Sequence, residues 1–238
     1  MTRARALGYV VARRMRGLYA IVDVGTLAAH RLDPVAFADA ILRVHPAALQ
    51  LRSKDSASRE TLALLRALAP MCHGAGVPLV ANDRPDFAVL AGCDLVHVGQ
   101  TDMPIERVRR ITPLLGVGVS THTLEQLDAA IAARPAYVAY GPVFETRTKA
   151  NPDPVVGVEG IRAASARAAA AGVPLVAIGG ITRERARDLV GLVDAVAIVA
   201  DLVPAAMGSD TLREVTARAR ILNDMFAPGP PALAGVAR

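Results

Sequence analysis

Cationic, acidic and hydroxyl side chains are placed along this sequence in a pattern that suits phosphate chemistry. Arg52, Lys54 and Lys149, with hydroxyl groups nearby, are the residue types that bind a phosphorylated, strongly anionic ligand. The carboxylates of Asp83 and Asp102 are ligands that Mg²⁺ takes together with phosphate oxygens and water. These residue types predict a site for one or two phosphate-bearing substrates and a divalent cation.

Each polar group directly follows a short apolar run. Gln50, Arg52 and Lys54 alternate, so on an extended strand their side chains point to one side. Two glycines precede a predicted helix, where free backbone N–H groups can point at a phosphate. The polar segments are Gln50-Leu51-Arg52-Ser53-Lys54, Asn82-Asp83-Arg84, Gly99-Gln100-Thr101-Asp102, Ser120-Thr121-His122-Thr123, Gly141-Pro142-Val143-Phe144-Glu145-Thr146-Arg147-Thr148-Lys149 and Gly179-Gly180-Ile181-Thr182.

Several of these residues also have a purely structural interpretation. Asp83 precedes Pro85 and Asp102 precedes Pro104, so either carboxylate could cap a helix N-terminus. The three polar residues of segment 50–54 could form a salt-bridged rim, although charge inside a barrel is costly without a ligand. His97 is expected to be a packed core histidine. The segment 141–157 is long for a connecting loop and is the candidate lid.

The elements that position these residues alternate regularly between strand and helix. Eight apolar runs of four or five residues are typical of strands buried on both faces. They are residues 18–22, 48–51, 78–81, 95–98, 115–119, 137–140, 175–178 and 195–199. Helical spacing of Leu, Ile and Ala between them predicts helices over residues 59–73, 124–133, 158–171 and 183–190. Gly74 and Gly172 are expected to end helices.

Eight strand–helix units within about 205 residues predict a closed (β/α)8 TIM barrel. Its active site is built at the carboxyl ends of the strands, where the polar segments fall. The rival is a doubly wound open sheet. That fold normally has fewer strands, and the dinucleotide-binding glycine pattern is missing after the first run, where Val24-Gly25-Thr26-Leu27 stands.

Composition limits the other possibilities. The chain of 238 residues is 53% hydrophobic and 3% aromatic, so we expect a large aliphatic core and no aromatic surface for nucleic acid. The formal net charge of +5 comes from five arginines in residues 1–16, and the remainder is neutral. No apolar run is long enough to span a membrane. Cys72 and Cys93 have no metal-ligand spacing, so we expect two reduced, buried thiols in a cytoplasmic protein.

The predicted domain organisation is a basic N-terminal extension over residues 1–16, a barrel domain over residues 17–225 and a disordered tail over residues 226–238. The sequence leaves open whether copies of the chain form a homo-oligomer.

The ordered set of polar segments resembles the thiamine phosphate synthase family over roughly residues 18–204. The resemblance implies a (β/α)8 enzyme that couples 4-amino-5-hydroxymethyl-2-methylpyrimidine diphosphate with 4-methyl-5-(2-hydroxyethyl)thiazole phosphate. The products are thiamine phosphate and pyrophosphate, and Mg²⁺ is required. The implied mechanism is dissociative: the bond to the diphosphate breaks first, and the thiazole nitrogen then attacks a pyrimidine carbocation. No catalytic base is needed.

The resemblance also implies a role for each matching residue. Arg52, Lys54 and Lys149 would hold the diphosphate, and Asp83 and Asp102 would hold Mg²⁺. The pyrimidine would lie against Gln50 and Asn82, with Ser120 near the reacting centre. The catalytic set is Arg52, Lys54, Ser120 and Lys149. The thiazole phosphate would be bound by Thr146, Thr148, the backbone of Gly180 and the last strand's end at Val199 and Ala200.

Two departures from the family pattern affect the phosphate half of the site. Glu145 replaces the usual proline after the phenylalanine, which adds a negative charge near the predicted anion site. Ala200 replaces a serine, and Asp201 follows it, where a carboxylate beside a phosphate would repel it unless it points away. A backbone N–H at Ala200 could still contact a phosphate.

Two other functions are alternatives. A thiazole tautomerase of the same fold would use His122 as an acid/base and would need neither diphosphate nor metal. A non-catalytic phosphate-binding barrel is suggested by Glu145 and Ala200. The presence of Gln50 together with the predicted cation and metal ligands favours the synthase.

Overall fold

A computed structural model describes residues 15–146 and 153–226 of the chain. Most of the predicted basic extension and all but the first residue of the predicted tail lie outside the described residues. So do Thr148 and Lys149, two of the predicted substrate-binding residues.

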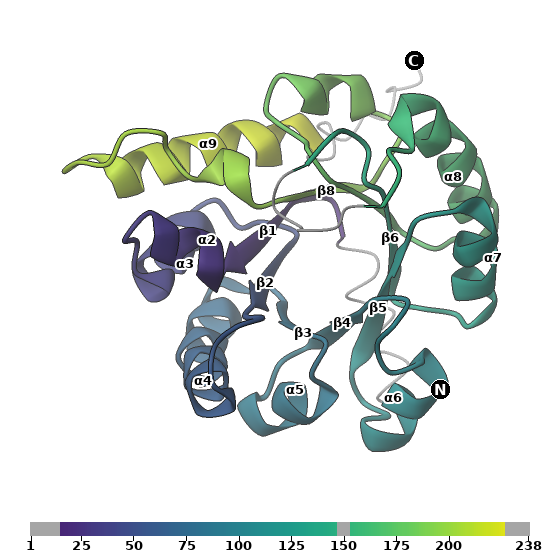
Figure 1. Ribbon diagram of the computed structural model, residues 1–238, viewed down its shortest axis with the longest axis horizontal. Helices are drawn as coiled ribbons and strands as arrows, with labels where there is room; N and C mark the ends of the chain where they lie inside the picture. The colour runs from purple at the N-terminus through teal and green to yellow at the C-terminus, as the bar shows by residue number, and fades with distance from the viewer. Residues whose placement is uncertain (1–14, 147–152, 227–238) are drawn as a thin grey trace, which may run out of the picture.

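Eight parallel strands close into a barrel in the described part of the chain, as the sequence predicts (Figure 1). Each strand pairs with the next in sequence, and β8 pairs with β1. This order excludes the open sheet. The strands are β1 (Gly17–Asp23), β2 (Ala48–Arg52), β3 (Leu79–Asn82), β4 (Leu95–Val98), β5 (Gly116–Thr121), β6 (Tyr137–Tyr140), β7 (Leu175–Ile178) and β8 (Ala195–Ile198).

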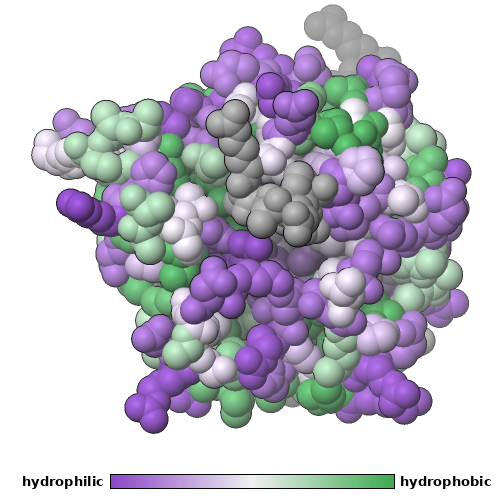
Figure 2. All heavy atoms as spheres, viewed as in Figure 1, coloured by the Kyte–Doolittle hydropathy of each residue, from purple (hydrophilic) through white to green (hydrophobic). Residues whose placement is uncertain are grey.

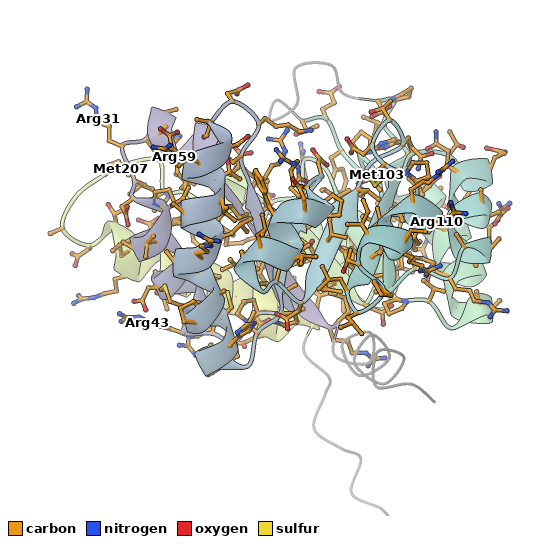
Figure 3. All side chains as sticks on the ribbon, turned by 90° about the horizontal axis from the view of Figure 1, so that it is seen from below. Arg31, Arg43, Arg59, Met103, Arg110 and Met207 are labelled. Atoms are coloured by element: carbon orange, nitrogen blue, oxygen red, sulfur yellow. The ribbon has the colours of Figure 1, made fainter. Side chains whose placement is uncertain are left out.

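Helices surround the barrel and cover the outward faces of the strands (Figures 1 and 3). The α-helices are α2 (Val24–Ala29), α3 (Pro34–Leu42), α4 (Ser58–Ala75), α5 (Pro85–Ala91), α6 (Ile105–Ile111), α7 (Leu124–Ala132), α8 (Gly157–Ala171) and α9 (Thr211–Phe226). Two short 3₁₀ helices, η1 (Arg185–Leu189) and η2 (Ala200–Leu202), follow β7 and β8. None of the helices in residues 15–146 and 153–226 is long and apolar enough to cross a membrane.

Alternate residues of each strand point outward to the helices or inward to the barrel interior. The outward set forms one large apolar core with the helices, and both free cysteines are buried there, as predicted. The inward set forms a second cluster that includes Tyr19, Leu95 and Tyr137. Met15, which is 1% exposed, belongs to the inward cluster and precedes the amino end of β1. Toward the carboxyl ends of several strands, the inward positions become polar.

Two details of the predicted helices were wrong. Gly74 lies inside α4, and the helix ends two residues later at Gly76, whose φ of 66° a glycine adopts without strain. The predicted helix over residues 183–190 is the 3₁₀ turn η1. Its buried residues, Ala186 and Leu189, are three positions apart, and that spacing places them on one face at three residues per turn. Gly172 does end α8, as expected.

Candidate active site

Arg52 ends β2 and forms a short ion pair with Asp23, the last residue of the neighbouring strand β1. Asp23 is 6% exposed, and its carboxylate also accepts hydrogen bonds from the backbone N–H and the hydroxyl of Thr26, which fixes the start of α2. The guanidinium of Arg52 is thus held at the carboxyl end of the barrel by a carboxylate that is itself anchored. A partly buried, oriented guanidinium is well suited to bind a phosphate.

Lys54 lies just beyond β2 and contacts Asp83, just beyond β3, with 2.5 Å between Nζ and Oδ2. Asp83 has a φ of 62°, and the N-cap position of α5 is occupied by Arg84, so Asp83 is not the cap of that helix. Burial raises the pKa of Asp83, and the adjacent Asp102 carboxylate raises it further against the opposing effect of Lys54.

Asp102 accepts a hydrogen bond from the Gly99 backbone N–H at 2.7 Å and does not cap α6, whose N-cap residue is Pro104. The Asp83 and Asp102 carboxylates meet above β3 and β4, and the Lys54 ammonium group contacts Asp83. Two adjacent carboxylates whose charges repel each other also attract a divalent cation, so the donor set fits Mg²⁺.

A cavity of about 300 Å³ adjoins Asp83. It is lined by Ser53, Lys54, Asn82 and Asp83 among others. A larger hollow of about 740 Å³ lies at one edge of the molecule, near Arg31 and Met207 (Figure 3), and none of the predicted site residues lines it. In Figure 2, hydrophilic residues lie below and beside the centre of the face shown.

Gln50 and Ser120 lie deeper, on the inward face of the barrel. The Gln50 amide nitrogen donates to the Tyr19 hydroxyl at 3.0 Å, and the Ser120 hydroxyl contacts His97 Nε2 at 2.7 Å. Burial lowers the pKa of His97 to about 4, so its imidazole is neutral near pH 7. His97 is buried as expected, but its contact with Ser120 gives it a place in the site.

The β6 and β7 loops pack closely against each other. Gly180 has a φ of 62°, and a Cβ there would lie 2.3 Å from the Glu145 carbonyl oxygen, so only glycine fits. The packing alone therefore accounts for a glycine at this position. The close approach also brings the backbone next to Thr146 against Gly180, so both predicted phosphate-binding positions lie in adjoining loops.

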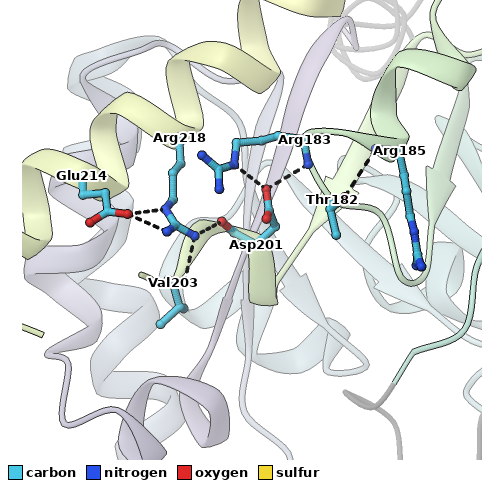
Figure 4. A network of polar contacts seen from close by, with 7 residues as sticks. All are labelled: Thr182, Arg183, Arg185, Asp201, Val203, Glu214 and Arg218. Atoms are coloured by element: carbon cyan, nitrogen blue, oxygen red, sulfur yellow. Dashed lines mark hydrogen bonds and ion pairs between the residues drawn. The ribbon is translucent and has the colours of Figure 1, made fainter. Parts of the chain in front are cut away.

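The Asp201 carboxylate points toward Arg183. Its carboxylate accepts from the Arg183 backbone N–H at 3.0 Å and from Nε at 2.9 Å (Figure 4). Arg218 of α9 donates to the carbonyl oxygens of Asp201 and Val203, and its guanidinium pairs with Glu214 (Figure 4). The Arg183–Asp201 ion pair compensates the charge of Asp201, and the bonds from Arg218 fix the backbone of Asp201 and Val203 beyond β8.

His122 is engaged on both ring nitrogens. Nδ1 lies 2.6 Å from the Gly141 carbonyl oxygen, which can only accept, so Nδ1 carries a proton. Nε2 lies 3.4 Å from the Asp153 carboxylate. A histidine with both nitrogens held by the protein is poorly placed as the acid/base of a tautomerase.

Sequence reasoning missed Asp23, Tyr19 and Tyr137, which hold the predicted site residues in place. A usable signal was present, because Tyr19 and Asp23 share the inward face of β1 at even spacing. The structure brings Arg52, Lys54, Asn82, Asp83, Asp102, Gln50 and Ser120 to one end of the barrel, while their roles stay predictions.

Comparison with known proteins identifies the family. Residues 18–202 match the family model described as thiamine monophosphate synthase. The chain belongs to the thiamine monophosphate synthase family.

Named relatives agree with this family. The thiamine-phosphate synthase of Koribacter versatilis is 42% identical over 194 residues, which cover 78% of this chain and 88% of that protein. The corresponding protein of Anaeromyxobacter dehalogenans is 39% identical over 206 residues and 86% of each chain. The solved structure of thiamine phosphate pyrophosphorylase from Pyrococcus furiosus has a TM-score of 0.74 and 28% identity, covering 90% of this chain and 98% of that one.

Proposed function

We propose that the protein is a thiamine phosphate synthase that joins a pyrimidine diphosphate to a thiazole phosphate and releases pyrophosphate. It is an enzyme of the transferase class, as its family membership and relatives indicate. The observation that carries the assignment to this site is the meeting of Arg52, Lys54 and the Asp83–Asp102 carboxylates at one barrel end. In the proposed reaction, that grouping would supply positive charge and metal ligands to one leaving group.

The diphosphate half of the site combines one fixed cation, Arg52, and one movable cation, Lys54, with a carboxylate pair. Arg52 is oriented by Asp23, and its remaining N–H groups can donate to diphosphate oxygens. Asp83 and Asp102 would hold Mg²⁺, which when bound supplies positive charge to the departing diphosphate. Lys54, now paired with Asp83, is half exposed and can turn its ammonium to the ligand. Lys149 would add a third cation from the predicted lid.

The pyrimidine and thiazole ends are separated along the barrel axis. Gln50 and Asn82 would line the pyrimidine deep in the barrel, and Ser120 would lie beside the reacting carbon. Thr146, Thr148 and the backbone at Gly180, Val199 and Ala200 would bind the thiazole phosphate nearer the surface. The Arg183–Asp201 pair supports this arrangement, because it keeps the Asp201 carboxylate turned from the phosphate.

The proposed reaction is a dissociative substitution. The carbon–oxygen bond to the diphosphate breaks, and the thiazole nitrogen attacks the pyrimidine carbocation. The residues named above orient two substrates and stabilise the departing anion, and neither task requires a nucleophile or a base.

The direct test is to incubate the full chain with both substrates and Mg²⁺ and to follow thiamine phosphate and pyrophosphate together. We expect the two products in equal amounts, no product when either substrate is omitted, and no product after chelation of divalent metal. Absence of product from folded protein with all components would reject the synthase. Turnover that survives complete chelation would reject the metal role of Asp83 and Asp102.

A further inference from the structure

A continuous chain of hydrogen bonds crosses the barrel interior and ends at two predicted substrate-binding residues. We call these five side chains the interior chain. Its contacts are Gln50 to Tyr19 at 3.0 Å, Tyr19 to Tyr137 at 2.7 Å, Tyr137 to His97 Nδ1 at 2.8 Å and His97 Nε2 to Ser120 at 2.7 Å. The members come from five different strands, and four of them are less than 9% exposed.

The protons of the interior chain can be placed by counting donors. The Gln50 amide nitrogen donates to the Tyr19 oxygen. If Tyr137 also donated to Tyr19, the single Tyr19 proton would be buried with no acceptor among the described residues, which is costly. Tyr19 therefore donates to Tyr137, and the Tyr137 proton must go to His97.

The same count of donors and acceptors places the protons of His97 and Ser120. His97 accepts on Nδ1, so its neutral ring carries the proton on Nε2 and donates it to the Ser120 oxygen. Ser120 is the half-buried end of the interior chain, and its own hydroxyl proton is left for a group outside the chain.

We propose that the interior chain is directed from Gln50 to Ser120, so that it holds His97 as the Nε2–H tautomer and commits the Ser120 hydroxyl to donate to the substrate. The substrate atom beside Ser120 is then an acceptor, such as an unprotonated ring nitrogen. Tyr19, Tyr137 and His97 are positioning residues, because they act through Ser120. The assignment of a substrate to Ser120 rests on the proposed function, whereas the direction of the chain does not.

Packing around Tyr137 holds its phenol in one position. Tyr137 lies opposite Gly118 of β5, where a Cβ would come within 2.0 Å of the ring carbon Cζ and 2.4 Å of the hydroxyl oxygen. The Tyr137 ring also stacks on His97, with 5.6 Å between centroids and 16° between planes. The phenol is therefore held in one place, which keeps its hydroxyl between Tyr19 and His97.

The first test is the tautomer of His97 in the ligand-free protein, measured by long-range ¹H–¹⁵N NMR near neutral pH. The His97→Gln variant assigns the signal among the five histidines of the chain. We expect the Nε2–H tautomer. The Nδ1–H tautomer would overturn the proposed direction, whether or not the protein is a synthase.

The second test reverses the chain from its far end. In Gln50→Glu an ionised carboxylate can only accept, so Tyr19 must donate to it and each later proton must turn round. We expect His97 to change to the Nδ1–H tautomer at a pH where the ¹³C signal shows the new carboxyl to be ionised. Gln126→Glu is the control, since Gln126 accepts from the His122 N–H outside the chain and adds the same charge. An unchanged His97 signal in Gln50→Glu, or the same change in both variants, would overturn the proposal.

The third test asks whether the chain positions Ser120 for turnover. Tyr137→Phe removes the donor to His97 and leaves Gln50 and Ser120 in place. We expect about a tenfold loss of kcat/KM for the pyrimidine diphosphate, the size of one hydrogen bond, with the KM for the thiazole phosphate unchanged. Normal kcat/KM in the folded variant would overturn the positioning role. A wild-type protein with no turnover would instead reject the proposed function and leave the tautomer result standing.

Discussion

Two ion pairs at the carboxyl end of the barrel use the same chemistry in different ways. Lys54–Asp83 joins the loops after β2 and β3, and Arg183–Asp201 joins those after β7 and β8. The Lys54 side chain is 49% exposed, and Asp83 also meets a second carboxylate. The Arg183 side chain is 26% exposed, and Asp201 also accepts from a backbone N–H.

This difference in exposure indicates that a ligand can open the Lys54–Asp83 pair, whereas the Arg183–Asp201 pair stabilises the fold. A half-exposed lysine pair contributes little to stability and can exchange its partner for a phosphate. A bonded, partly buried arginine pair leaves unsatisfied donors when it is broken. We therefore expect substitutions in the first pair to change activity and substitutions in the second to change stability.

The largest effect on activity is expected when either carboxylate of the Asp83–Asp102 pair is removed. Asp83→Ala and Asp102→Ala should each reduce coupling on the order of a hundredfold or more, because each removes a ligand of the cation that stabilises the leaving group. Thiazole phosphate should still bind, as measured by calorimetry. Asp86→Ala is a matched control, since Asp86 pairs with the exposed Arg84. Near-normal turnover in both variants would show that Asp83 and Asp102 do not hold the metal.

Asp201→Ala should show the reverse pattern, with a clear loss of stability and little loss of activity. Its loss leaves the Arg183 backbone N–H and guanidinium without their acceptor, so the free energy of unfolding should fall by about 1–3 kcal/mol. Urea denaturation measures this change. Asp201→Asn keeps an acceptor and should recover part of the loss. The expected effect on turnover is confined to a rise in KM for the thiazole phosphate, and a loss of kcat as large as that of Asp83→Ala would contradict the contrast.

The smallest effect on stability is expected at Glu214, which lies at the edge of the network around the Arg183–Asp201 pair. Glu214 pairs with Arg218 one helical turn later on α9, while Arg218 also donates to two carbonyl oxygens. Glu214→Ala should therefore lower the free energy of unfolding by about 0.5 kcal/mol and leave turnover unchanged. A loss comparable with that of Asp201→Ala would mean that the whole network in Figure 4 acts as one unit.

Much of the barrel could be predicted because its strands are short apolar runs without alternation. The predicted bounds of β4, β6 and β7 agree with the structure. Exact helix ends were less predictable, because Gly74 and Gly76 both suit a helix end and only the backbone angle at Gly76 decides between them. The turn at η1 was missed because a single pair of apolar residues fits either helical period.

The candidate site was predictable where a residue type by itself suggests chemistry. Arg52, Asp83 and Asp102 are charged at strand ends, so their grouping follows from the parallel sheet. The contacts that hold these residues in place cannot be predicted from residue type alone. Asp23 could be taken for a helix cap, which it is, and its second role with Arg52 depends on the pairing of β1 with β2.

The contact between Gly118 and Tyr137 couples the packing of these two positions. A methyl group at residue 118 would displace the phenol, and a smaller residue at 137 would leave a gap beside the glycine. The energetic effect of a substitution at one of these positions therefore depends on the residue present at the other.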